Sequence, residues 1–438
     1  MRTAPGPKAL APITVGVLVA AVGLIAGAAA QPYFRQALGD GLSDEYDEIA
    51  INLVEHGRFG ADLQHWERPT VTRGPAYPLY LAAVFEASGV RNTRAVAVAD
   101  MLILALTAAL LTAILQGTVP TPAAAAGGLI FAFWPTTFYY AAKGTSETLL
   151  ALFLTASLAA LASLRARPGW RPAAVLGACL GLACLTRGSA VALLAIAAAW
   201  MFAARRALPR SVPVALALAW VLTMSPWWIR NARVSGAFVP FHTLTWYNAY
   251  HDDVFDRTRR WLDSQGLGGE DWQSVDPARI PAWLPKPPPG FVYPAALEAR
   301  ADLAQEDRYR AIMLEKFRSP GYLLDKMMRN AVDFWSAAAS MSKTRKLLLT
   351  SLAWLGLYAA GLWVALRDPS VRWHARVCLA FVALTWTLYL PIFAVFRFSV
   401  PTAPFIAATL GLALGARRPG SRRAQVPRDA GAKPASAP

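Results

Sequence analysis

The stretch "RAVAVADMLILALTAALLTAIL", residues 94–115, decides the class of fold. After Arg94 it contains one charged residue, Asp100, and it is long enough for a helix to cross a bilayer, which takes about 20 mostly apolar residues. Comparable segments recur along the whole chain, at 10–30, 94–115, 122–142, 147–164, 172–186, 188–204, 211–229, 347–366, 375–393 and 398–416. The sequence therefore predicts an all-α polytopic membrane protein of about ten transmembrane helices.

The composition agrees with this class. Of the 438 residues 55% are hydrophobic and only 16% are charged, a balance too apolar for an ordinary soluble domain. The net charge of +16 comes largely from arginines in alternate short connections, as the positive-inside rule requires of cytoplasmic loops. The basic charge thus reports topology and does not indicate a nucleic-acid partner. We expect a plasma (inner) membrane protein with both termini in the cytoplasm.

This topology leaves two large loops on the external, or periplasmic, face. Loop one has two helix-like pieces: one begins near Ser43, and the other, residues 73–89, is too short to span and is expected in the membrane interface. Loop two ends in two amphipathic helices separated at Pro320. The predicted regions are a first transmembrane helix at 1–30, loop one at 31–93, a transmembrane core at 94–229, loop two at 230–346, C-terminal transmembrane helices at 347–416 and a disordered cytoplasmic tail at 417–438.

Six segments in a fixed order carry a resemblance to a known family. They are "SDEYDEIAINLVEHGRFG" (43–60), "RPTVTRGPAYPLYLAAVFEASG" (68–89), "KGTSETLLALFL" (143–154), "CLTRGSAVALLAIAAAW" (184–200), "PWWIRNARVSGAFVPFHT" (226–243) and "FRFSVPTAPFI" (396–406). The chain resembles the GT-C integral-membrane glycosyltransferases, in particular bacterial relatives of protein O-mannosyltransferases and of lipid A aminoarabinose transferases. The resemblance implies a GT-C-like bundle with interfacial helices in the first external loop.

The resemblance also implies an activity. A hexosyl- or pentosyltransferase of this kind moves a sugar from a polyprenyl-phosphate donor to a glycan, lipid or protein acceptor at the external face, with inversion. A hydroxyl is a poor nucleophile at neutral pH, so a carboxylate must accept its proton. The family uses a first-loop acid, in a register where this chain has Leu42. We expect Asp44 to be the base, with Glu45 and Asp40 as the alternatives.

A second acid, Glu147, opens the span at 147–164, where the family places an acid that assists the first. Its alternative role is a favourable charge at a helix N-terminus, which also accounts for Asp47 and Glu48. Asp100 is a further candidate, because a charge inside a span is costly unless it is paired or faces a wet cavity. It is expected either in the substrate site or paired with a residue such as Arg94.

Basic residues at the outer ends of spans are the candidates for binding the donor phosphate. The positive-inside rule does not account for their place, and the arginine fork matches phosphate oxygens. The candidates, in order, are Arg73 and Arg397, then Lys143 and Arg187, with Arg230 as a further basic residue at this face. The alternative is that each merely extends its charged end to the interface.

Two alternatives remain open at this level. A divalent cation could bind the cluster of His251, Asp252, Asp253 and Asp256, but we expect a solvated polar turn there and no metal or other cofactor. The chain could also be a polytopic transporter or a non-catalytic subunit of a polysaccharide assembly system. A transporter should place its ionisable residues near the bilayer midplane, whereas here they gather at helix ends and in loops.

Overall fold

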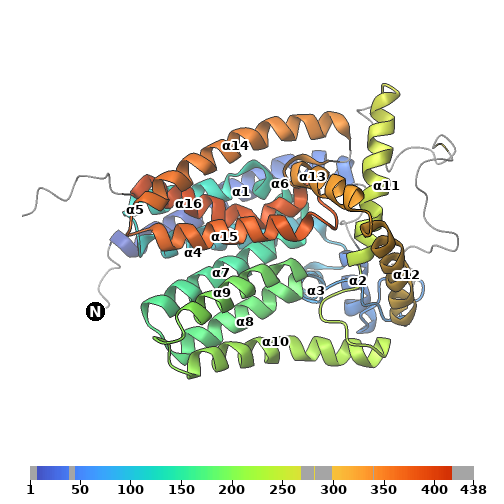
Figure 1. Ribbon diagram of the computed structural model, residues 1–438, viewed down its shortest axis with the longest axis horizontal. Coiled ribbons are helices and arrows are strands. Elements are labelled where there is room, and N and C mark those ends of the chain that lie inside the picture. Colours follow the sequence, from blue (N-terminus) through green and yellow to red (C-terminus); the bar gives the residue numbers. More distant parts are fainter. Residues whose placement is uncertain (1–6, 39–44, 268–280, 282–297, 339, 417–438) are drawn as a thin grey trace, which may run out of the picture.

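The computed structural model describes residues 7–38, 45–267, 281, 298–338 and 340–416. These parts of the chain are helical and contain no β-strand (Figure 1). The helices of the first half are α1 (Pro7–Leu38), α2 (Tyr46–His56), α3 (Ala76–Ser88), α4 (Thr93–Gln116), α5 (Thr121–Ala132), α6 (Pro135–Lys143), α7 (Ser146–Ala166), α8 (Trp170–Thr186), η1 (Gly188–Ala190), α9 (Val191–Ala203) and α10 (Ser211–Ser235). Those of the second half are α11 (Thr245–Ser264), α12 (Ala299–Phe317), α13 (Pro320–Ser336), α14 (Met341–Arg367), α15 (Arg372–Tyr389), η5 (Phe396–Thr402) and α16 (Ala403–Gly415).

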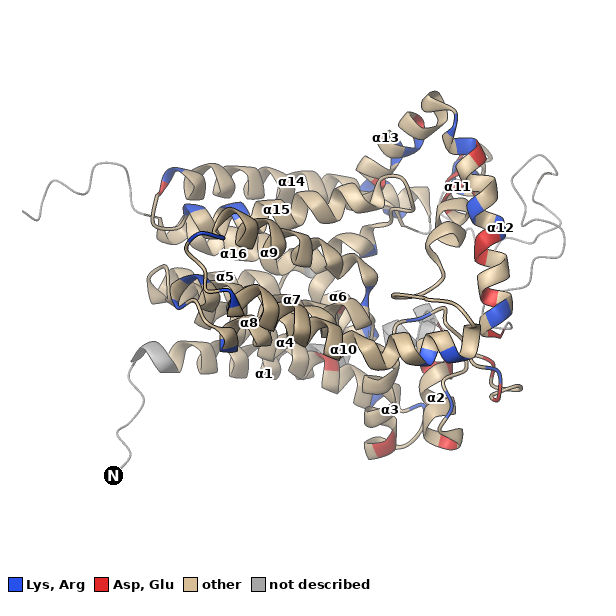
Figure 2. Cartoon of the chain, turned by 60° about the horizontal axis from the view of Figure 1, so that its bottom comes forward, with Lys and Arg blue, Asp and Glu red and all other residues tan. Residues whose placement is uncertain are grey.

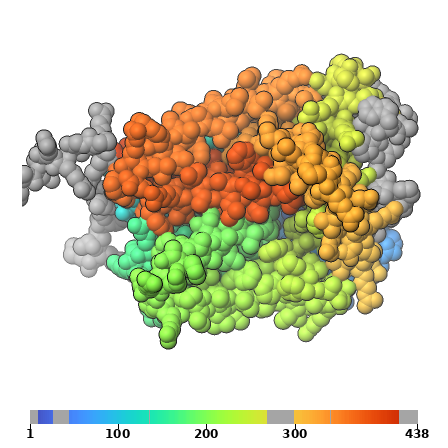
Figure 3. Space-filling view, viewed as in Figure 1, coloured from blue at the N-terminus to red at the C-terminus, as the bar shows by residue number. Residues whose placement is uncertain are grey.

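The long apolar helices run side by side as a bundle, with α14 along one edge and α10 along the other (Figure 1). In the space-filling view the green helices and the orange and red C-terminal helices occupy opposite halves of one face (Figure 3). Among the residues that the structure describes, five segments are long and apolar enough to cross a membrane: α4, α7, α10, α14 and η5 with α16. Shorter apolar helices lie at Leu10–Ile25, α5, α8 and Gly188–Ala203. The chain is therefore an all-α, multi-pass membrane protein, as predicted.

The boundaries differ most from those predicted at two places. The segment expected as one span at 122–142 is divided into α5 and α6, because Pro135 begins α6 and the preceding Trp134 is extended at φ −58° and ψ 122°. A residue before proline is disfavoured in the helical region, so the helix ends there. Helix α1 continues to Leu38, beyond the expected end at residue 30.

Small residues let helices of the bundle approach closely. A Cβ built on Gly411 of α16 would lie 3.1 Å from the Cα of Gly127 in α5. The two backbones therefore meet at a pair of glycines, a common way to pack helices where lipid supplies no hydrophobic driving force. This contact holds the C-terminal helix, which follows η5, against the N-terminal half of the bundle.

The remaining helices, α2, α3, α11, α12 and α13, cover one end of the bundle and are called the cap below (Figures 1 and 2). Helices α2 and α3 correspond to the two pieces expected in loop one, and α12 and α13 to the two expected at the end of loop two. Figure 2 shows lysines and arginines at both ends of the bundle, whereas acidic residues are concentrated on the cap side.

Candidate active site

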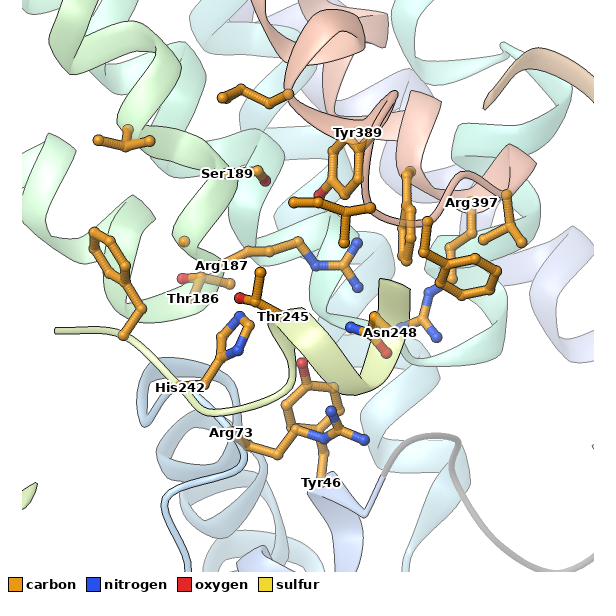
Figure 4. Close-up of a pocket in the computed structure, with 18 residues that line it drawn as sticks. Tyr46, Arg73, Thr186, Arg187, Ser189, His242, Thr245, Asn248, Tyr389 and Arg397 are labelled. Atoms are coloured by element: carbon orange, nitrogen blue, oxygen red, sulfur yellow. The ribbon is translucent and has the colours of Figure 1, made fainter. Parts of the chain in front are cut away.

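A cavity of about 410 Å³ lies where the cap meets the ends of the transmembrane helices (Figure 4). Tyr46 and Arg73 line it from the region of α2 and α3. The other lining residues come from three segments. Residues 186–191 follow the end of α8, residues 241–248 lie between α10 and the first turn of α11, and residues 388–398 run from the end of α15 into η5. Residues from distant parts of the sequence thus form one site, and three of them are arginines: Arg73, Arg187 and Arg397.

Glu147 holds two of these arginines. Its side chain is fully buried in the first turn of α7. Arg397 binds it with both ends of the guanidinium, at 2.6 Å from Nε to Oε1 and 3.1 Å from Nη2 to Oε2, and Arg187 Nη2 lies 3.0 Å from Oε1. A bidentate pair of this kind fixes the orientation of the arginine as well as its charge. Glu147 is therefore placed to orient Arg187 and Arg397 toward the cavity.

The local sequence explains how Arg73 and Arg187 come together. Gly74 lies so close to the end of α8 that a Cβ on it would be 2.3 Å from the carbonyl oxygen of Leu185. Only glycine permits this approach, which places the residue before it beside the residue that follows α8. Arg187 also lies over the ring of Phe398, with its guanidinium carbon 5.0 Å from the ring centre. The "TRGP" and "LTRGS" segments thus form one wall.

Glu45 is the described first-loop acid nearest this wall. It precedes α2 with φ 63° and ψ 7°, a left-handed conformation that is rare outside glycine. The side chain is buried, and its Oε2 lies 3.6 Å from Nη2 of Arg73. Strained backbone of this type is concentrated at functional sites. Asp44 and Asp40, the other two candidates for the base, lie outside the described residues.

Uncharged polar side chains lie among the arginines of the cavity. His242, Thr245 and Asn248 line it, the latter two from the first turn of α11 (Figure 4). Burial, helped by the neighbouring charges of Arg73 and Arg187, lowers the pKa of His242 to about 4. The imidazole is therefore uncharged at neutral pH, so these side chains offer hydrogen-bonding groups without charge.

The start of α11 is fixed by α12. Glu306 accepts hydrogen bonds from the backbone N–H groups of Trp246 at 2.7 Å and Tyr247 at 3.0 Å. These are N–H groups that a helix N-terminus leaves without an intrahelical partner. The carboxylate thus holds Thr245 and Asn248 at the cavity from the other side of the helix.

Three predicted basic or acidic residues lie elsewhere. Asp100 is buried in α4 and is not among the cavity-lining residues; it accepts a hydrogen bond of 2.7 Å from the hydroxyl of Tyr80, a partner that the sequence did not suggest. Lys143 ends α6 and does not line the cavity. Arg230 donates to the carbonyl oxygens of Thr70 at 2.6 Å and Phe59 at 3.0 Å, so it ties loop one to the end of α10.

The prediction of a solvated turn at residues 251–256 is wrong. These residues lie in α11, and Asp252, Asp253 and Asp256 are buried. Lys326 and Arg329 of α13 supply counter-charges, together with Lys316 of α12 for Asp253 and Arg259 and Arg260 of α11 for Asp256. Sequence alone could not show the burial of Asp252, because Lys326, which pairs with it, lies 74 residues further along the chain. Within the described ranges, no group of three or more His, Cys, Asp or Glu side chains is arranged to hold a metal ion.

Comparison with known proteins agrees with the resemblance. Residues 72–229 match the family "Dolichyl-phosphate-mannose-protein mannosyltransferase". No curated protein matches the chain. Two solved structures of ArnT from Cupriavidus metallidurans each align over 92% of this chain and 77% of theirs: the undecaprenyl phosphate complex at 15% identity with a TM-score of 0.42, and the apo form at 14% with 0.36. The family match, which includes Arg73, Glu147 and Arg187, confirms the resemblance to GT-C membrane glycosyltransferases.

Proposed function

We propose that this membrane glycosyltransferase transfers a sugar from a polyprenyl-phosphate donor to a hydroxyl group of an acceptor, with inversion, in the arginine-lined cavity. The observation that carries the proposal is the convergence of Arg73, Arg187 and Arg397 on one cavity from three separate segments. The name of the matched family, which specifies a dolichyl-phosphate-mannose donor, supports a lipid-phosphate carrier. The acceptor is a glycan, a lipid or a protein of the cell envelope.

The charges of the cavity suit this donor. The described ionisable groups around it are three guanidiniums and the two carboxylates of Glu45 and Glu147, while His242 is neutral. A sugar linked through one phosphate is an anionic diester, and its leaving group gains negative charge as the glycosidic bond breaks. Preorganised cations stabilise this developing charge most strongly where water is excluded. In this proposal the arginines balance the charge, and no divalent cation takes part.

The proposed step is a single displacement. The acceptor oxygen attacks the anomeric carbon, the bond from that carbon to the phosphate oxygen breaks, and polyprenyl phosphate leaves. The acceptor's proton passes to a first-loop carboxylate, for which Asp44 remains the first candidate and Glu45 the second. Because one displacement inverts the anomeric centre, no covalent sugar-enzyme intermediate is formed.

The reaction is proposed to occur outside the cytoplasm. Basic residues lie at both ends of the bundle, but the positive-inside rule counts those in short connections (Figure 2). The short connections opposite the cap, at 165–171, 204–210 and 367–372, are rich in arginine, which supports a cytoplasmic position for that end and hence an external cap. We place the protein in the plasma (inner) membrane, where the donor's phosphate is presented at headgroup depth.

The orientation gives a first prediction. We expect a cysteine at Gln64, an exposed residue of the cap, to react with a membrane-impermeant maleimide in intact cells. A cysteine at Arg206, exposed after α9 at the other end of the bundle, should react only after permeabilisation. The reverse pattern would contradict an external active site, although it would leave the cavity itself in place.

The function gives a second prediction, for purified protein supplied with polyprenyl-phosphate sugar. Arg73→Ala is expected to lower transfer by about 100-fold, because one donor to the leaving phosphate is lost. Arg73→Lys should retain part of the activity, since lysine keeps the charge but not the planar fork. If Arg73 only extends to the interface, both variants will transfer sugar at the parental rate, and its assignment to phosphate binding fails.

A further inference from the structure

Helix α13 is amphipathic, but its apolar residues point outward and its polar residues point into the protein, the reverse of a helix that covers a soluble core. Leu324, Met328 and Val332 follow one another at intervals of four residues, and they are 62%, 64% and 48% exposed. The other side of the helix carries Lys326 and Asn330, which are fully buried. The polar face therefore points into the protein, and the apolar face, formed by Leu324, Met328 and Val332, points away from it.

Ion pairs and hydrogen bonds join the buried polar face of α13 to α11. Lys326 Nζ binds Asp252, donates to the carbonyl oxygen of Ala249 at 2.9 Å and lies 3.3 Å from Asp253 Oδ1. Arg329 Nη1 lies 3.1 Å from Asp256 Oδ2. Turning the helix to hide its apolar face would break these ion pairs and would take Lys326 away from the buried Asp252. The outward position of the apolar face is therefore imposed by the ion pairs on its other side.

The surroundings of α13 indicate what covers the apolar face. The helix packs against α14, a 27-residue apolar span whose Leu349 and Leu352 are also exposed, at 72% and 56%. The surface that faces lipid along α14 thus continues onto α13. With 17 residues and internal charges, α13 is too short and too polar to cross the membrane itself. An amphipathic helix of this kind lies in the plane of the interface.

We propose that the apolar face of α13 inserts into the lipid leaflet on the cap side of the membrane. The pair of Asp325 and Arg329, 3.0 Å apart from Oδ2 to Nε, then marks the water-facing edge, because the Asp325 side chain is 68% exposed. The membrane surface thereby fixes the depth of α13. The occupant of the apolar face is lipid, not another protein.

This insertion has a consequence for the cavity, which rests on the proposed function. Besides holding α11, α13 accepts a hydrogen bond from Trp386 Nε1 at the carbonyl oxygen of Ala331, at 3.1 Å, and Asn330 donates to the carbonyl oxygen of Leu390 at 2.8 Å. The helix is thus attached to two walls of the cavity, the start of α11 and the segment that leads into η5 and Arg397. Lipid insertion would place both walls at the depth where a lipid carrier presents its phosphate.

The test measures the depth of α13 directly. A fluorophore is attached at Met328→Cys, or at Asp307→Cys as the control on α12, in a chain whose native Cys179, Cys184 and Cys378 are replaced by alanine. Asp307 is the matched site because its side chain is 74% exposed on the polar cap. Each protein is reconstituted into phosphatidylcholine and phosphatidylglycerol vesicles, and its fluorescence is quenched either by acyl-chain nitroxide lipids or by aqueous iodide.

We expect strong nitroxide quenching at position 328, with iodide quenching about fivefold weaker than at position 307. Equal iodide quenching at the two positions would overturn the proposal, because the face would then be in water. Protection from both quenchers at position 328 would also overturn it, since another protein surface would then cover the face. The quenching measurement needs no sugar donor and is therefore independent of the proposed function. A lack of sugar transfer in a parallel assay would contradict the proposed function but not the insertion of α13 into lipid.

Discussion

Arg397→Ala is expected to reduce sugar transfer by about 100- to 1,000-fold, the usual effect of removing one preorganised donor to a charge that develops in the transition state. Arg397 reaches the cavity from η5, and its bidentate contact with Glu147 fixes the direction of its guanidinium. The loss should appear mainly in kcat, because the contact strengthens as the phosphate leaves. Steady-state transfer from purified polyprenyl-phosphate sugar measures it.

Two variants keep this prediction specific. Arg397→Lys should recover only part of the activity, because a lysine cannot form the two parallel hydrogen bonds of a guanidinium. Arg94→Ala, which removes an exposed arginine at the start of α4, should leave transfer unchanged. An Arg397→Ala protein that transfers sugar like the parent would remove Arg397 from the proposed site.

Glu147→Gln is expected to have the second large effect, on both activity and stability. The glutamine keeps the shape of the side chain but withdraws the counter-charge of two arginines, and breaking a buried ion pair in this way typically costs about 3–5 kcal/mol. Transfer should fall by about 100-fold or more, because Arg187 and Arg397 lose the group that orients them. Thermal unfolding in detergent and the transfer rate are measured on the same preparation.

A double-mutant cycle tests whether Glu147 acts by orienting Arg397 or only by stabilising the fold. If Glu147 acts through Arg397, the double variant of Glu147→Gln and Arg397→Ala should transfer sugar no more slowly than the less active of the two single variants. Independent roles would instead multiply the two losses. Glu86→Gln, at an exposed acid of α3, is the matched control and should behave like the parent in both measurements.

The sequence predicted the membrane-spanning class because long apolar runs need no tertiary partner to be recognised. It also named Arg73, Arg187 and Arg397, since arginines at the unexpected end of spans stand out against the positive-inside rule. It could not show that Glu147 binds two of them, because Arg397 lies 250 residues away from it in sequence. The same limit applies to Asp252 of α11, which is buried because Lys326 of α13 pairs with it.

Other lining residues carried no distinctive pattern. His242, Thr245 and Asn248 belong to an ordinary mixture of polar and aromatic residues after α10. The contact of α12 with the start of α11 positions Thr245 and Asn248, and a backbone hydrogen bond from Thr243 to Val71 ties the segment of His242 to loop one. Conversely, Asp100 and Lys143 are charged and lie near the outer ends of predicted spans, yet they do not line this cavity. Sequence position along a span does not specify which side of the helix faces the site.

The central claim is that the arginine-lined cavity binds the phosphate of the polyprenyl carrier. Photocrosslinking with a polyprenyl phosphate that carries a diazirine on its first isoprene unit, followed by peptide mass spectrometry, tests it most directly because no residue is changed. We predict that the label attaches within 186–191, 241–248 or 388–398, and that unlabelled polyprenyl phosphate competes for these sites. Labelling confined to the lipid-facing surface of the bundle, or labelling of the cavity that excess polyprenyl phosphate does not reduce, would contradict the claim.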